Sequence, residues 1–132
     1  MRIAEHLYKA EAFDRASSRL DPGEDGELYV VFLMRAGTQR INAALHALNV
    51  TCEDGATSVQ PGDLNHTYKP PLPAPPPEAL RAAFAELAYI ENLRPDYVRG
   101  GGTLSEQVAE RVQIAYGRIV VDTDAVFGEG RS

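Results

Sequence analysis

Hydrophobic side chains recur at steps of three or four residues in four separate segments of this chain. Their stripes are Ile3, Leu7, Ala10, Phe13, Ala16 and Leu20; Val31, Met34, Ile41, Leu45 and Leu48; Leu80, Ala83, Phe84, Leu87, Ile90 and Leu93; and Leu104, Val108, Val112, Ala115 and Ile119. This spacing places the apolar side chains on one face of an α-helix. Helices of this length are marginal alone, so the pattern predicts an all-α fold, a four-helix bundle.

Several residues predict where these helices begin, bend and end. Asp21-Pro22-Gly23 should end the first helix, and Thr103 with Glu106 has the capping-box spacing expected at the start of the fourth. We expect the fourth helix to fade near Asp122. The apolar run 28–33 also suits a strand, but the helical pattern continues well beyond it, which favours a helix. Gly37, inside that helix, indicates either the close approach of a neighbouring helix or a kink.

The connection between the second and third helices is long and rich in proline. Residues 49–77 contain seven of the chain's nine prolines. From residue 68 to 77 the chain should be extended and can travel the height of a bundle, so the helices that it joins need not be antiparallel neighbours. It could be a lid, a docking segment or a passive strap. We expect one domain over residues 1–127 that includes this linker, followed by a flexible tail at 128–132.

Composition excludes several classes of function. The formal net charge is -6, with 19 acidic against 13 basic residues, which argues against a general binder of nucleic acid or anionic membranes. The single cysteine, Cys52, can form neither an internal disulfide nor a cysteine-based zinc site. The longest apolar run, residues 28–34, is far too short for a membrane span. We therefore expect a cytoplasmic protein with no membrane partner.

Arg40 and His46 are separated by five residues in the second predicted helix. An arginine four to six residues before a histidine resembles the signature of the HEPN family of small helical-bundle proteins, and the chain length and helical class are similar too. The resemblance implies a metal-independent ribonuclease, or an RNA-binding module derived from one. His46 would be the acid/base and Arg40 would stabilise the phosphate. The alternative interpretation places both side chains at the edge of the helix with a structural role.

A second candidate site lies just before the fourth predicted helix. Arginines and glycines gather there, and the residues concerned are Arg94, Tyr97, Arg99, Gly101 and Thr103. Free N–H groups at a helix start and nearby guanidinium groups attract anions, which predicts a site for a small anion or phosphate ligand. The alternative is a hinge with solvated arginines.

The three histidines, His6, His46 and His66, lie in different segments, and no pair has the spacing of ligands on one helix. Asp63 and His66 form an acid–histidine pair that is close in sequence. We therefore expect no metal and no cofactor.

The remaining expectation concerns association. The second predicted helix carries apolar residues on more than one face, and such surfaces are commonly covered by another copy. We expect a non-enzymatic module that works by binding or self-association. It should form a homodimer, and it could also bind a protein partner. Catalysis and contact with nucleic acid belong only to the HEPN-like alternative.

Overall fold

The computed structural model describes residues 1–64, 75–93 and 103–128. These residues form helices α1 (Ile3–Ser17), α2 (Gly26–Ala47), α3 (Arg81–Glu91) and α5 (Glu106–Gly128), and a short 3-10 helix, η1 (Glu78–Leu80), that leads into α3. No strand occurs among the described residues, which confirms the all-α prediction. The strand alternative for residues 28–33 is wrong, because the whole run lies inside α2.

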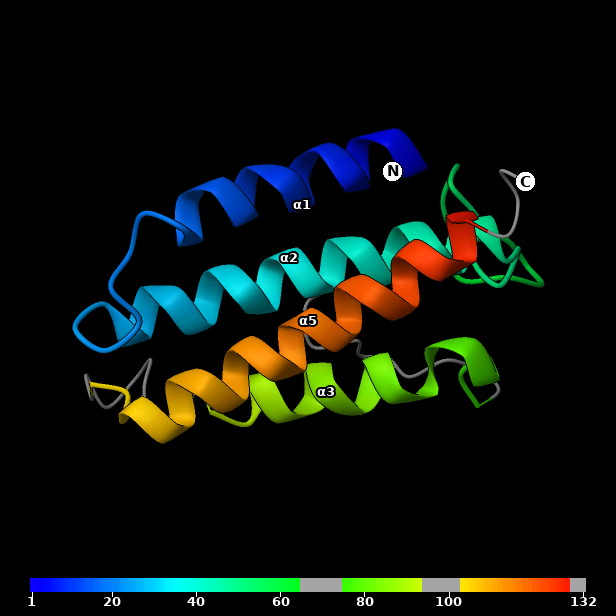
Figure 1. Cartoon of the computed structure of the whole chain (residues 1–132). Helices are drawn as coiled ribbons and strands as arrows, with labels where there is room; N and C mark the ends of the chain where they lie inside the picture. Colours follow the sequence, from blue (N-terminus) through cyan, green and yellow to red (C-terminus); the bar gives the residue numbers. More distant parts are fainter. Residues whose placement is uncertain (65–74, 94–102, 129–132) are drawn as a thin grey trace.

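Helix α2 occupies the middle of the molecule and contacts α1, α3 and α5 (Figure 1). Helices α1 and α2 run antiparallel along one side, while α3 and α5 pack on the other side of α2 (Figure 1). Most of the apolar residues that α2 carries on more than one face are buried by this arrangement. The fully covered side chains of α2 include Val30, Leu33, Met34, Ile41 and Leu45. Helices of the same chain thus cover most of the surface that we expected a second copy to cover. The homodimer stays a prediction.

Gly37 lies where α2 meets two other helices. A Cβ atom at this position would lie 3.3 Å from Leu87 Cδ1 of α3 and 3.3 Å from Ile119 Cδ1 of α5. These distances are tighter than ordinary van der Waals contact, so a larger residue here would require the side chains of Leu87 and Ile119 to shift by a few tenths of an ångström. Gly37 thus lies at a close approach of neighbouring helices, which is the first of the two predicted roles.

Both ends of α5 differ from the prediction. The helix continues to Gly128 rather than fading near Asp122. Thr123 is buried and its hydroxyl donates to Ile119 O (2.7 Å), so the tertiary core keeps this turn helical. At the start, Ser105 Oγ accepts a hydrogen bond from Val108 N (3.1 Å), whereas Thr103 lies two residues outside the cap and is exposed. Ser105 is therefore the capping residue, as serine commonly is.

The described part of the connection after α2 turns back across that helix. Cys52 N donates to Pro61 O (2.9 Å) and Thr57 N donates to Gln60 O (2.8 Å), which closes residues 52–61 into a compact loop. After Gly62, Asp63 and Leu64 lie against α2. The segment expected to be extended is residues 68–77, of which 68–74 lie outside the described residues. None of the described helices combines the length and apolar character that a membrane span requires.

Candidate metal centre

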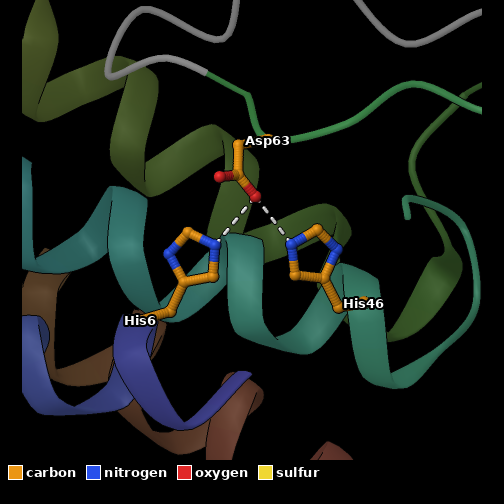
Figure 2. Close-up of side chains that lie close together, drawn as sticks. All are labelled: His6, His46 and Asp63. Carbon is orange, nitrogen blue, oxygen red and sulfur yellow. Dashed lines mark hydrogen bonds and ion pairs between the residues drawn. The ribbon is translucent and has the colours of Figure 1, made fainter. Parts of the chain in front are cut away.

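Two histidines and one aspartate meet where α1, α2 and the following loop come together. His6 Nε2 of α1 lies 2.9 Å from Asp63 Oδ1, and His46 Nε2 of α2 lies 2.7 Å from the same oxygen. Figure 2 shows both rings pointing at this one atom from either side. The ring centroids are 5.2 Å apart. Three groups that are distant in sequence thus converge on a single point.

The outer nitrogen of each ring faces an oxygen atom. His6 Nδ1 lies 2.6 Å from Gln39 Oε1, and His46 Nδ1 lies 2.6 Å from Thr51 Oγ1. An ionised carboxylate cannot donate a proton, so without a metal ion the Nε2 of each ring donates its N–H to Asp63 Oδ1. A bound cation would take the place of these two protons, and each ring would then donate from Nδ1 to the oxygen behind it. Histidines that bind metals are usually held in this way by an oxygen behind the ring.

Asp63 is held over the two rings by its neighbour, Leu64. Leu64 N donates to Asn42 Oδ1 and Asn42 Nδ2 donates to Leu64 O, and both hydrogen bonds are 2.8 Å long. Asn42 lies one helical turn before His46 on α2 and is buried, so this clamp ties the loop to the helix that carries the ligand. The second carboxylate oxygen, Asp63 Oδ2, accepts a hydrogen bond from the amino group of Met1 (2.9 Å).

The carboxylate of Asp63 stays ionised in this setting. Partial burial raises its pKa, but the hydrogen bonds from the Met1 amino group, His6 and His46 together lower it more strongly. The net result is a pKa of about 2, against an ordinary value of 3.8. A full negative charge is therefore available to a cation throughout the neutral pH range.

The three groups differ in their access to solvent. The side chains of His6 and His46 are 2% and 0% exposed, whereas that of Asp63 is 34% exposed. The two imidazoles of the site are therefore buried, and its carboxylate lies at the surface. An ion could enter from the Asp63 side and keep contact with water there.

The donor set fits a divalent first-row transition metal. The three ligand atoms all lie within 4.8 Å of one another. Ligand atoms around a tetrahedral zinc ion are about 3.3 Å apart, so binding requires the Asp63 oxygen to move away from the imidazoles by roughly half an ångström and the two imidazole nitrogens to come closer together. Imidazole nitrogen suits Zn²⁺, Fe²⁺ and Ni²⁺, whereas Ca²⁺ and Mg²⁺ prefer sites made only of oxygen.

The structure gives the two residues of the HEPN-like motif separate partners. Arg40 Nε donates to Tyr116 Oη (2.9 Å) of α5, and its NH2 donates to Asp14 Oδ2 (2.6 Å) of α1. Tyr116 also donates to the other oxygen of Asp14. Arg40 thus joins α1, α2 and α5 in one polar cluster, while His46 belongs to the cluster around Asp63. Neither residue appears among the other's hydrogen-bond or ion-pair partners in the described part of the chain.

Burial and hydrogen bonds shift two pKa values in the Arg40 cluster. Burial lowers the pKa of Arg40, but its bonds to Tyr116 and Asp14 raise it more, so the net shift is upward. Burial and the bond to Asp14 raise the pKa of Tyr116 well above its ordinary value. Arg40 is therefore a permanent cation and Tyr116 a permanent phenol, which suits a structural role.

Only one of the five residues of the predicted anion site, Thr103, lies within the described residues. Arg94, Tyr97, Arg99 and Gly101 lie outside them, and Thr103 is exposed. His66, which the sequence places beside Asp63, also lies outside the described residues.

The sequence interpretation missed the convergence of His6, His46 and Asp63, because 57 positions separate His6 from Asp63 and 17 separate His46 from it. One signal was present. Thr38, Asn42 and His46 follow one another at four-residue steps, which forms a polar stripe on an otherwise apolar helix. All three are buried, so each needs a polar partner from another segment.

Comparison of the chain with protein-family models, with curated proteins and with solved structures finds no match.

Proposed function

We propose that this protein binds one divalent first-row transition-metal ion through His6 Nε2, His46 Nε2 and the carboxylate of Asp63. The observation that carries the proposal is the convergence of two buried imidazoles on one carboxylate oxygen, at 2.9 and 2.7 Å. The proposal departs from the expectation of no metal, which considered only spacing along the chain.

Two further features support a metal rather than a purely structural polar cluster. Gln39 and Thr51 place an oxygen behind each imidazole, which orients the rings for coordination. Asp63 carries a negative charge at a solvent-accessible edge, where an ion can exchange. Three protein ligands leave at least one position on a zinc ion for water or a small ligand, as in zinc sites that act on substrates rather than only stabilise a fold.

Zinc titration of the chain without a polyhistidine tag tests the proposal. We expect one Zn²⁺ per chain, measured by competition with a chromophoric chelator. His46→Gln and His6→Gln should each weaken binding at least about 100-fold, because a two-ligand site loses most of its affinity. Asp54→Asn is the matched control, since Asp54 is an exposed acid in the same loop and should leave the affinity unchanged.

Cobalt substitution supplies a readout that does not depend on stability. Bound Co²⁺ should give visible absorption bands typical of a four- or five-coordinate site in the wild type. These bands should disappear in both histidine variants, with circular dichroism showing that each variant is still helical. Equal zinc affinity in the wild type and His46→Gln would overturn the proposal.

We also propose, from the sequence pattern, that the helices form a four-helix bundle with a proline-rich connection between α2 and α3, and that the protein self-associates. Ile114 and Val121 support self-association, because they are 47% and 66% exposed and lie two turns apart on α5. Light scattering over a range of concentrations tests this second proposal, and a monomer at high concentration would refute it. A protein partner and the HEPN-like ribonuclease stay predictions.

A further inference from the structure

A cleft of about 350 Å³ opens between α1 and α2, next to the metal centre. Helix α1 contributes Lys9 and Phe13 to it, α2 contributes Arg35 and Gln39, and Leu64 lines it from the loop. Gln39 Oε1 faces the Nδ1 edge of the His6 ring, whereas Asp63 faces the Nε2 edge. The cleft therefore lies behind His6 as seen from Asp63, and it shares Gln39 and Leu64 with the surroundings of the metal centre.

The charge of the cleft is opposite to that of the whole chain. Lys9 and Arg35 are both exposed, and they are the only charged side chains among the described residues that line it. Neither has an ion-pair partner within the part of the chain that the structure describes. The chain as a whole has a net charge of -6. Two unpaired cations in a concave site raise the local potential and favour an anion there.

The rest of the lining is a mixture of apolar and hydrogen-bonding groups. Phe13, Ala12 and Leu64 offer an apolar wall, and Gln39 offers a side-chain amide. A cleft of this volume is at the small end of those that hold organic ligands. The combination fits a molecule with a charged head and a small apolar body.

We propose that this cleft binds a small organic phosphate. Arg35 and Lys9 contact the phosphate group, because a guanidinium can bond two phosphate oxygens at once and an ammonium adds a second charge. Phe13 and Leu64 contact the apolar body. This proposal does not depend on the metal site, since none of the three metal ligands lines the cleft.

Isothermal titration calorimetry tests this proposal by measuring the binding of phenyl phosphate to the full chain in the presence of EDTA. EDTA removes any metal, so phosphate cannot coordinate an ion at Asp63. We expect saturable binding that is at least about fivefold tighter than that of inorganic phosphate, because only phenyl phosphate reaches the apolar wall. Lys9→Gln and Arg35→Gln should each weaken binding about fivefold.

Arg15→Gln is the matched control, because Arg15 is an exposed cation on α1 that does not line the cleft. It should leave the affinity unchanged. The proposal is overturned if phenyl phosphate does not bind, if inorganic phosphate binds equally well, or if Arg15→Gln weakens binding as much as Arg35→Gln. None of these results would bear on zinc binding, which is measured separately and without phosphate.

Discussion

Asn42 and Leu64 exchange two hydrogen bonds of 2.8 Å, one from the Leu64 backbone N–H to the Asn42 side chain and one from that side chain to the Leu64 carbonyl. The bonds pair a side-chain amide with a backbone amide in the same way as two strands pair with each other. Both residues are buried, so water does not compete for these bonds. This clamp holds Asp63 over the histidines.

Asn42→Ala should therefore affect stability and zinc binding together. Removing the amide leaves the Leu64 N–H and carbonyl without their partner, which should lower the free energy of unfolding by about 2–3 kcal/mol. Zinc affinity should fall about 10- to 100-fold, because Asp63 is no longer positioned. Urea denaturation and zinc competition measure the two effects. Thr123→Val, which removes a buried hydroxyl bond in α5, should lower stability without changing zinc affinity.

Thr51→Val tests the contact behind the His46 ring. Thr51 is 2% exposed and its hydroxyl lies 2.6 Å from His46 Nδ1. Valine has nearly the same shape but cannot orient the ring, so zinc affinity should fall about 10-fold or more. The cobalt spectrum should shift but persist, since all three ligands remain. An unchanged affinity would show that Thr51 does not position His46.

Asp63 should make stability depend on pH in the acid range. Its pKa is about 2 in the folded protein, below the ordinary value of 3.8, so the folded state binds the proton more weakly. The stabilisation is fully present above pH 3.8 and is lost as the pH falls toward 2. Because the side chain is about one third exposed, we expect roughly 1 kcal/mol.

Chemical denaturation of metal-free protein at a series of pH values measures this effect. The difference in unfolding free energy between the wild type and Asp63→Asn should shrink as the pH falls through this window. A difference that stays constant down to pH 2 would contradict the assignment.

Asp14→Asn should destabilise the protein without changing zinc binding. The Arg40 side chain is 11% exposed and relies on Asp14 and Tyr116 for its hydrogen bonds. Removing the charge of Asp14 leaves a largely buried cation that keeps its bond to Tyr116 but whose only remaining charged partner among the described residues is Asp124, at 3.7 Å, which should cost about 2 kcal/mol. Thermal denaturation measures the loss. Reduced zinc affinity in this variant would show that the Arg40 cluster and the metal centre are coupled.

The order of residues along the chain was sufficient to predict the helices. Apolar side chains at three- and four-residue steps can be buried together only on a helix, so α1, α2, α3 and α5 follow from local spacing. Gly37 also followed, at least as one of two alternatives, because a glycine inside a helix has a cost that close packing explains. The ends of α5 were predicted less well, since Thr123 is kept helical by burial and not by local signals.

The candidate metal centre depended on tertiary structure. Nothing near His6 or His46 in the sequence is a ligand for the same ion, and the spacing of 57 positions between His6 and Asp63 has no helical or turn meaning. Packing of α1 on α2 brings the two imidazoles together, and the Asn42–Leu64 clamp adds the carboxylate. The local sequence pattern reflects the geometry of one helix. A site shared by three segments can be predicted only when the way in which those segments pack on one another is known.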